Sequence, residues 1–505
     1  MPHRDLPRFA DLRAFLDFLE ARGDLVRIAH PVAVRHDMAE VHRRVLAAGG
    51  PALLFEKPIL DDGSISPVPV VVNLFGTVAR TALGLGVEAT GLDRLGDELA
   101  ALRDPTPPDG VREAIDRLPL LAAALKLRPR RVRTAPVQER ILTGAEIDLT
   151  RLPIQTCRAG EPAPLVTWGM VVTEPPDASS SAKANVGVYR LQVVGRDRLI
   201  TRWLAHRGGA QHHRAWAKQG REMPIAVVLG ADPATILAAV MPLPEGLSEL
   251  HFAGLLRGER ARLVKAHSVP LWVPADAEMV IEGFVSPTET LPEGPYGDHT
   301  GYWNSVEPFP VMRVTAITMR REPIYPSTYT GRPPDEPSRI GEALNRLFLP
   351  ILKKQFPEVT DFHLPPEACS YRIAVIAIDK RYPGQARRIM MGLWSMLPQF
   401  TMTKLVIVVD AGVDVASWED VMWAISTRSD PSRDVMLVDR TPIDHLDFAS
   451  PQAGLGGKMG IDATTKIGPE TTREWAQVLE TDPETAARVD AIWADLGLDT
   501  GKAPR

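Results

Sequence analysis

The chain has 505 residues, of which 45% are apolar and 24% charged, and its formal net charge is -5. This length exceeds what a single hydrophobic core usually supports, so two or three domains are expected. The slightly acidic balance argues against a nucleic-acid-binding protein, which would more often be basic.

Targeting and redox signals point to the cytoplasm. The apolar run at 405–413 is far shorter than the ~18 residues of a membrane span. The charged start lacks the apolar stretch of a secretory signal. Only Cys157 and Cys369 are present, and two distant thiols indicate a reducing compartment rather than a disulfide scaffold.

The first part of the chain predicts an α/β domain over residues 1–125. Apolar residues recur at helical spacing and a glycine follows, which predicts a helix over 11–23. The apolar runs at 51–56 and 69–76 suit buried strands. A stretch rich in Pro and Arg then surrounds one short apolar helix at 118–127, and it marks the domain boundary.

Residues 126–332 are rich in short strand patterns separated by turn signals, which predicts a barrel-like β domain. The strand candidates lie at residues 167–173, 186–194, 198–204, 225–231, 279–285 and 312–319.

Residues 333–505 predict a parallel α/β domain that ends in a C-terminal helix, because helical and buried-strand patterns alternate. The helical patterns lie at 339–356 and 385–397, and the strand patterns at 371–379, 404–412 and 434–439.

Several common catalytic motifs are missing. The chain contains no P-loop and no H-E-x-x-H. The glycine-rich stretches "GLGVEATG" at 84–91 and "GLGGKMG" at 454–460 miss the G-x-G-x-x-G spacing. A Rossmann dehydrogenase is therefore not supported.

A set of polar residues remains in the β region. Taken singly, each has an ordinary structural explanation, such as a turn residue for Asn185 or an exposed ion pair for Arg190. The stretch "LPEGPYGDHTGYW" at 291–303 is too rich in Gly and Pro for a helix and predicts a loop or a strand-to-turn passage. The candidates are Asn185, Arg190, His206, Glu249, Glu293 and Asp298.

Eight stretches, taken together and in order, resemble the UbiD family of prenylated-FMN-dependent decarboxylases. The resemblance spans about residues 150–475, and it is strongest to the bacterial branch that acts on polyprenyl-4-hydroxybenzoate in ubiquinone biosynthesis. The stretches are "NVGVYRLQ", "TRWLAHRGGA", "LGADPATIL", "FAGLLRG", "PEGPYGDHTGYW", "STYTGRPPDEP", "PPEACSYR" and "DFASP".

The resemblance implies a multidomain α/β fold: an N-terminal α/β domain, a central split β-barrel domain related to flavin reductases that binds the cofactor, and a C-terminal α/β oligomerisation domain. It implies non-oxidative decarboxylation of 3-polyprenyl-4-hydroxybenzoate to 2-polyprenylphenol. One alternative is a reversible enzyme of the same family that decarboxylates another hydroxybenzoic, heteroaromatic or acrylic acid and can also carboxylate. The others are an NAD(P)H flavin reductase and a non-catalytic flavin-binding protein.

The resemblance also assigns roles to residues. Asn185, His206 and Glu249 match ligands of a Mn²⁺ or Mg²⁺ ion that holds the cofactor phosphate, and a K⁺ ion is expected nearby. Glu293 is expected to stay charged beside Arg190, while Asp298 carries the proton with a raised pKa. Arg190, Glu293 and Asp298 form the expected catalytic set. The expected cofactor contacts are Val188, Tyr189, Arg190, Arg202, Trp203, Leu204, Arg207, Gly208 and Lys404.

The expected partners follow from the same resemblance. They are a small aromatic acid, a flavin prenyltransferase that supplies the cofactor, and further copies of the chain in a dimer or hexamer, with no nucleic acid. Peripheral contact with the inner membrane would suit a lipid-tailed substrate. His212, His213 and His251 depart from the ubiquinone-pathway branch; we interpret them as surface variation, although they put strict equivalence of substrate in doubt.

Overall fold

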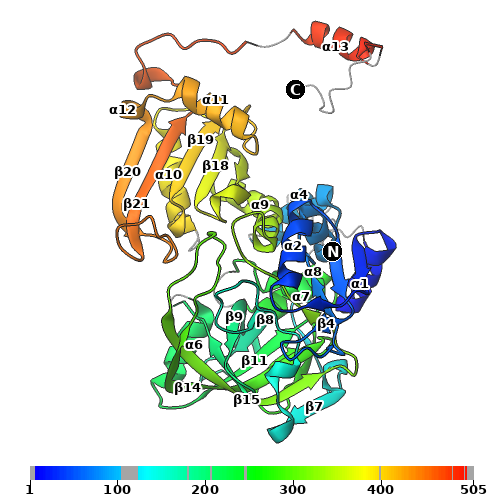
Figure 1. Cartoon of the computed structure of the whole chain (residues 1–505). Helices are drawn as coiled ribbons and strands as arrows, with labels where there is room; N and C mark the ends of the chain where they lie inside the picture. Colours follow the sequence, from blue (N-terminus) through cyan, green and yellow to red (C-terminus); the bar gives the residue numbers. More distant parts are fainter. Residues whose placement is uncertain are drawn as a thin grey trace.

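The computed structural model describes residues 6–103, 123–178, 181–204, 207–243, 247–396, 400–479, 482–493 and 495–496. An α/β region at the N-terminus adjoins a central β-barrel, and a second α/β region follows (Figure 1). The multidomain α/β fold is confirmed. The short helix expected at 118–127 lies mostly outside the described residues.

The helix predicted at the start of the chain is α1 (Leu12–Ala21). Asp11 caps it by accepting the N–H of Ala14, and Gly23 follows with φ of 77°, so the helix begins and ends at the signals in the sequence. The other helices of this region are α2 (Asp37–Ala47), α3 (Val78–Leu85) and α4 (Leu92–Arg103).

The N-terminal sheet has the order β1-β3-β5-β16. Its last strand comes from the far end of the barrel segment and pairs in parallel with β5. The barrel segment is thereby tied to the N-terminal sheet by backbone hydrogen bonds. The strands are β1 (Leu25–Ile28), β3 (Ala52–Phe55), β5 (Val70–Val72) and β16 (Tyr325–Pro326), beside the small pair β2 (Val32–Ala33) and β4 (Pro58–Ile59).

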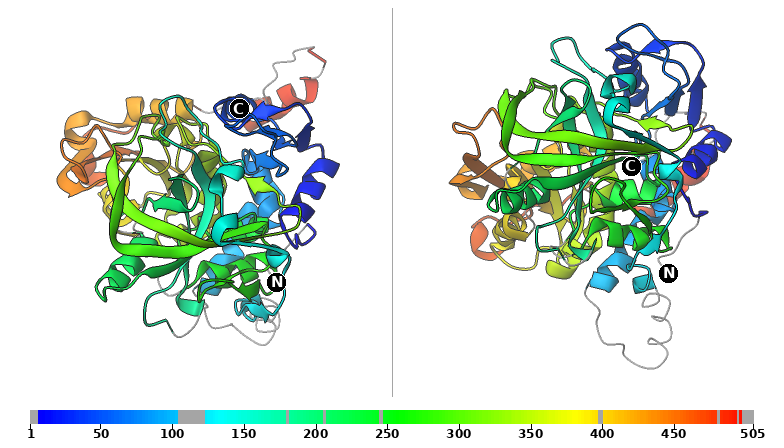
Figure 2. Two further views of the ribbon diagram at one scale, coloured as in Figure 1. Left: turned by 60° about the horizontal axis from the view of Figure 1, so that its bottom comes forward. Right: turned by 90° about the horizontal axis from the view of Figure 1, so that it is seen from below.

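The central sheet closes into a barrel of six strands in the order β10-β9-β8-β11-β14-β15, because β10 also pairs with β15. β7 pairs in the antiparallel direction with the C-terminal end of β15. The two long strands β14 and β15 curve together along the barrel (Figure 2, green). The strands are β7 (Arg140–Thr143), β8 (Leu165–Thr173), β9 (Asn185–Val193), β10 (Arg198–Thr201), β11 (Met223–Leu229), β14 (Met279–Glu293) and β15 (Glu307–Met319).

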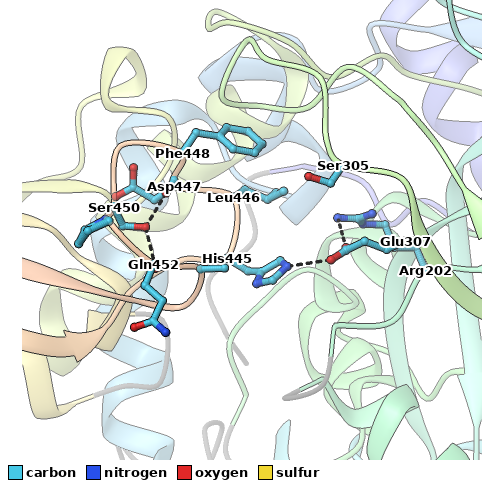
Figure 3. Close-up of a pocket in the computed structure, with 11 residues that line it drawn as sticks. Arg202, Ser305, Glu307, His445, Leu446, Asp447, Phe448, Ser450 and Gln452 are labelled. Atoms are coloured by element: carbon cyan, nitrogen blue, oxygen red, sulfur yellow. Dashed lines mark hydrogen bonds and ion pairs between the residues drawn. The ribbon is translucent and has the colours of Figure 1, made fainter.

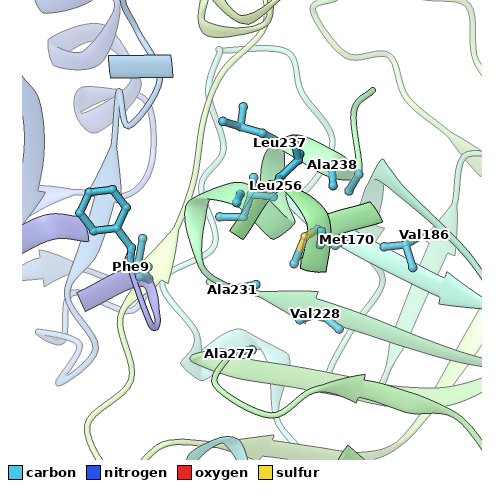
Figure 4. Close-up of a cluster of buried hydrophobic side chains, with 14 of the residues drawn as sticks. Phe9, Met170, Val186, Val228, Ala231, Leu237, Ala238, Leu256 and Ala277 are labelled. Atoms are coloured by element: carbon cyan, nitrogen blue, oxygen red, sulfur yellow. The ribbon is translucent and has the colours of Figure 1, made fainter. Parts of the chain in front are cut away.

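Smaller elements cover the barrel and share its core. Phe9 of the N-terminal region belongs to the same buried apolar cluster as Met170 and Val228 of the barrel and Leu237 and Leu256 of the covering helices (Figure 4). The barrel and the N-terminal region therefore share this cluster, and a second cluster also joins them. The covering elements are β6 (Arg130–Val132), β12 (Arg262–Lys265), β13 (Trp272–Pro274), α6 (Gly208–Ala217), α7 (Pro233–Ala238) and α8 (Glu249–Arg257).

The C-terminal sheet has the order β17-β18-β19-β21-β20. The central strands β18, β19 and β21 are parallel, but both edge strands are antiparallel, so the predicted parallel sheet is only its centre. Alternate residues of β18 face two separate apolar clusters, one on each side of the sheet, which explains the continuous apolar runs. The strands are β17 (Val359–His363), β18 (Ile373–Ile378), β19 (Leu405–Asp410), β20 (Val435–Pro442) and β21 (Leu455–Ala463).

Helix α9 connects the barrel to this sheet and packs against α3, α4 and β17. Asp335 caps it, and Glu336 on its first turn is fully buried. In the described residues, none of the helices combines the length and the apolar character that a bilayer crossing requires. The helices are α9 (Glu336–Gln355), α10 (Gln385–Met396), α11 (Trp418–Arg428), α12 (Pro431–Asp434) and α13 (Pro483–Ile492).

Candidate active site

The first of the two predicted active-site carboxylates stands at the end of a barrel strand. Glu293 is the last residue of β14 and pairs in register with Glu307 of β15. Gly294 follows with φ of 92°, a conformation that glycine adopts without strain, and its N–H donates to Gln192 Oε1 at 2.9 Å. The chain turns away from the sheet here, as the Gly- and Pro-rich sequence predicts.

The loop that follows is held by its own contacts. The Asn304 side chain accepts the N–H of Tyr296 at 2.7 Å, and the Asn304 N–H donates to the Tyr296 carbonyl at 3.0 Å. A Cβ on Gly297 would lie 2.3 Å from Nη1 of Arg158, so the loop packs closely against this side chain. Asp298 is therefore presented from a well-defined backbone.

Arg190 joins the two carboxylates. It lies on β9, and its Nε donates to Glu293 Oε1 at 2.9 Å while its Nη2 donates to Glu293 Oε2 at 3.3 Å. Its Nη1 donates to Asp298 Oδ2 at 2.8 Å. The structure thus brings together all three residues of the expected catalytic set, although more than a hundred residues separate Arg190 from the carboxylates.

Glu293 binds a second guanidinium group. Nη1 of Arg202 donates to Glu293 Oε2 at 2.9 Å, and the Glu293 side chain is fully buried. A buried carboxylate is stable only where charges and hydrogen bonds compensate its lost hydration, and two guanidinium groups do so here. Arg202 was expected to contact the cofactor, and its pairing with Glu293 was not predicted.

The charge state of Asp298 differs from the expectation. Burial by itself opposes ionisation, but a hydrogen bond from His299 and the charge of Arg190 outweigh it and lower the pKa of Asp298 below its usual range. The expected raised pKa considered burial and a neighbouring carboxylate only. In this arrangement Asp298 is ionised.

Two of the three expected metal ligands lie close together. Asn185 begins β9 and Glu249 begins α8, and Glu249 Oε2 accepts the N–H of Val186 at 2.8 Å. Burial raises the pKa of Glu249 to about 7, and Nδ2 of Asn185 is buried without a hydrogen-bond partner. His206 lies outside the described residues, and elsewhere the described chain gathers no three His, Cys, Asp or Glu side chains suited to a metal.

Eight of the expected cofactor residues lie in three segments of the barrel region. Val188, Tyr189 and Arg190 lie on β9; Arg202, Trp203 and Leu204 follow β10; Arg207 and Gly208 begin α6.

The start of α6 lies close to the side chains of Asn185 and Trp203. A Cβ on Gly208 would lie 2.1 Å from Asn185 Oδ1, and one on Gly209 would lie 2.9 Å from Trp203 Nε1. Arg207 at the N-cap position makes no side-chain cap, the Gly209 N–H donates to the Tyr189 hydroxyl at 3.4 Å, and Trp203 Nε1 is buried without a partner. N–H groups at a helix start suit an anion such as a phosphate.

The remaining expected cofactor residue, Lys404, comes from another part of the chain. It precedes β19 in the C-terminal region, and its Nζ donates to Asp447 Oδ2 at 2.8 Å. Asp447 belongs to the loop between β20 and β21.

The three unexpected histidines are not surface variation, since all are partly buried. His212 Nδ1 lies 3.0 Å from Thr173 Oγ1, and His213 Nε2 lies 2.9 Å from the Ser286 carbonyl. His251 Nε2 is buried without a partner, and burial lowers its pKa.

A cavity of about 260 Å³ lies between the barrel and the loop from β20 to β21 (Figure 3). Arg202 lines it and also binds Glu293, so the cavity adjoins the Arg190–Glu293–Asp298 set. Arg202 Nη2 is buried and has no hydrogen-bond partner. The lining residues are Arg202, Ser305, Glu307, His445, Leu446, Asp447, Phe448, Ser450, Pro451, Gln452 and Ala453.

Sequence reasoning missed two histidines at this site. His299 Nδ1 lies 2.7 Å from Asp298 Oδ1, and its position next to Asp298 in the chain was the available signal. His445 Nε2 lies 3.1 Å from Glu307 Oε1. No sequence pattern could indicate that contact, because it joins two regions of the fold.

Three family descriptions match the sequence. They are the 3-octaprenyl-4-hydroxybenzoate carboxy-lyase N-terminal domain at residues 16–99, the Rift-related domain of the same family at 130–333, and its C-terminal domain at 338–463.

Solved structures match over nearly the whole chain. A vanillic acid decarboxylase from Sedimentibacter hydroxybenzoicus, in closed form, is 28% identical over 97% of this chain and 99% of its own, with a TM-score of 0.82. The UbiD-class enzyme HmfF from Pelotomaculum thermopropionicum, in complex with FMN, is 30% identical over 94% of this chain and 98% of its own, with a TM-score of 0.77. A 3,4-dihydroxybenzoic acid decarboxylase from Enterobacter cloacae, at 22% identity over 95% and 99% of the two chains and a TM-score of 0.75, shares the fold.

Proposed function

The chain belongs to the UbiD family of carboxy-lyases, and on this premise we propose that it removes CO₂ from an aromatic acid with a single small ring, using prenylated FMN. The observation that carries the proposal is Arg190 held between Glu293 and Asp298 at the end of a barrel strand. The net reaction replaces the carboxylate of the acid by a proton and releases CO₂.

Prenylated FMN, when bound, supplies the electron sink that no side chain can offer to an aryl carbanion. The side chains supply position and charge. Arg190 and Arg202 are cations beside the reacting site, and Arg202 Nη2, which makes no hydrogen bond, lies 3.9 Å from Glu307 Oε2. Asp298 is the group that delivers the proton to the ring carbon. Because it is ionised in the described arrangement, it must take up a proton before each delivery.

The residues present fit the cofactor and a divalent cation. The N-terminal end of α6 and the unpartnered Trp203 Nε1 suit the cofactor phosphate. The amide oxygen of Asn185 and the carboxylate of Glu249 are hard donors, which Mn²⁺ and Mg²⁺ prefer. An adjacent cation would also neutralise Glu249, whose burial now opposes its charge. His206 completes the proposed ligand set, and a K⁺ ion remains an expectation.

The cavity has room for a single-ring acid, the alternative to a polyprenylated one. A cavity of about 150 Å³ is enough for benzene, so 260 Å³ accommodates a ring with a carboxylate and small substituents. The similarity to a vanillic acid decarboxylase supports the same alternative. Homo-oligomerisation, cytoplasmic location and supply of the cofactor by a flavin prenyltransferase belong to the proposal, whereas a single-ring acid requires no contact with a membrane.

A reconstitution experiment tests the proposal. The protein is produced together with a flavin prenyltransferase, its ligand is identified by mass and absorption spectra, and CO₂ release is measured in the presence of Mn²⁺. We expect bound prenylated FMN and turnover of hydroxybenzoic acids, with kcat/KM falling as the ring substituent lengthens. A rise with prenyl chain length would instead support the polyprenyl substrate. Absence of CO₂ release from every acid, with consumption of NADH and ordinary flavin, would replace the proposal by a flavin reductase.

A further inference from the structure

His299 stands between two acidic side chains from different regions of the fold. Its Nδ1 lies 2.7 Å from Asp298 Oδ1, and its Nε2 lies 3.9 Å from Asp444 Oδ2. The ring is 20% exposed, more than either carboxylate. Solvent therefore reaches the ring more readily than it reaches either acid.

Both acids are held independently of the ring. The backbone N–H of His299 donates to Asp298 Oδ1 at 2.8 Å, and Arg190 holds Asp298 Oδ2. Asp444 accepts hydrogen bonds from Arg372 Nη2 at 3.1 Å and from the Tyr371 hydroxyl at 3.3 Å. The imidazole thus occupies a position that its surroundings define.

These contacts restrict which groups can protonate Asp298. Its Oδ2 is bound by Arg190, and its Oδ1 is bound by two N–H groups of His299. The proton nearest to Asp298 that can transfer without breaking the Arg190 contact is the one on His299 Nδ1. No other residue of the expected catalytic set offers a transferable proton, since Glu293 is bound by two guanidinium groups.

The charges around the ring favour the imidazolium. Burial alone would lower the pKa of His299, but Asp298 and Asp444 outweigh it and raise the pKa, while Arg372 opposes them. Asp335, at the start of α9, also faces the ring. The two acids therefore favour the protonated ring beside an ionised Asp298.

We propose that His299 is a positioning residue that stores, between Asp298 and Asp444, the proton which Asp298 delivers to the ring carbon; the inference rests on the proposed decarboxylation. In the transfer, the Nδ1–H bond breaks, an O–H bond forms at Asp298 Oδ1, and the imidazolium becomes a neutral imidazole. An anionic substrate beside Arg190 shares its charge and so makes Asp298 a better proton acceptor. After the product leaves, the neutral ring takes up one proton from the solvent, which is the proton that the net reaction consumes.

The kinetic test replaces His299 by asparagine, which keeps a side-chain N–H near the place of Nδ1 but cannot carry the extra proton. Wild-type kcat should fall as pH rises through the His299 midpoint, because the imidazolium is lost. In His299→Asn, kcat should fall about a hundredfold with KM little changed, and this pH limb should disappear. His30→Asn, at an exposed histidine, is the matched control and should behave as wild type.

A second readout does not depend on turnover. NMR of the histidine rings in the cofactor-free protein should give His299 a titration midpoint above the ordinary histidine value. Asp444→Asn should lower this midpoint, because it removes one of the two anions that face the ring. This variant also tests the proposal if His299→Asn does not fold.

The outcomes separate this inference from the proposed function. Wild-type turnover with unchanged kcat and pH profile in His299→Asn would overturn the role of His299 and leave decarboxylation standing. Absence of turnover in the wild type would count against decarboxylation. In that case an ordinary His299 midpoint, unaffected by Asp444→Asn, would overturn the proton store as well, and a raised midpoint that Asp444→Asn lowers would support it.

Discussion

Replacing Glu293 by glutamine tests how the site compensates buried charge. The carboxylate accepts three N–H bonds, from Arg190 Nε at 2.9 Å, Arg190 Nη2 at 3.3 Å and Arg202 Nη1 at 2.9 Å. Glutamine keeps the shape but offers only one oxygen and turns an NH₂ group toward a guanidinium. Two buried cations then lose their shared anion, although Asp298 still pairs with Arg190.

The expected cost can be worked from these contacts. Removing one partner of a buried ion pair typically destabilises a protein by about 3–5 kcal/mol, because a charge is left without compensation. Since glutamine retains one acceptor and Asp298 remains, we expect a loss near the lower limit, about 3 kcal/mol. Turnover should fall by about a hundredfold or more, because Arg190 no longer has its fixed partner.

Urea unfolding measured by tryptophan fluorescence gives the change in the free energy of unfolding. The matched control is Glu289→Gln on the same strand, where the carboxylate pairs with Arg198 at 3.2 Å and both side chains are largely exposed. An exposed pair contributes less than about 1 kcal/mol. A loss in Glu293→Gln no larger than in this control would refute the compensation argument.

Three further variants test cofactor binding, pH-dependent stability and proton donation. Gly208→Ala should abolish metal and cofactor binding, seen by elemental analysis and absorption, because its Cβ would lie 2.1 Å from Asn185 Oδ1; Gly341→Ala, with open space around its Cβ, should leave both intact. Burial raises the pKa of Glu336 to about 7. The contribution of Glu336 to stability is therefore fully present below about pH 4.5 and is lost as pH rises through about 7, by at most about 1.4 kcal/mol per pH unit. Glu336→Gln should remove this pH dependence of the free energy of unfolding in urea, and an unchanged pH dependence would refute the assignment. Asp298→Asn should abolish CO₂ release while the circular dichroism spectrum stays that of the wild type, and normal turnover would exclude Asp298 as the proton donor.

Local patterns predicted all six strands of the closed barrel and the helices α1, α9 and α10, and the elements that they missed are instructive. The apolar side chains behind the first predicted helix are all buried in α1. Strand β21, in contrast, contains "GLGGKMG", which has too few side chains to read as a strand. Its pairing with β19 and β20 makes it one. The direction of the edge strands could not be predicted either, because a residue pattern specifies which faces are buried and not which way a strand runs.

The residues of the site could be named from the sequence only through the family resemblance. Arg190 and Glu293 have ordinary explanations when taken singly. The barrel brings them together, since β9 and β14 lie in one closed sheet. Asp444 and His445 carried no signal at all, because their partners His299 and Glu307 belong to the barrel.

The sequence by itself determined the residue types at the site and the turn that presents them: a carboxylate at the end of a strand, then Gly294 and Pro295, then Asp298 and His299. Only the tertiary structure decided which of these groups holds a proton. A pKa depends on the distance to every nearby charge and on burial, and those distances exist only once β9, β14 and the C-terminal loop lie side by side. For that reason Asp298 was expected to be protonated, and the folded protein instead places it, ionised, between Arg190 and His299.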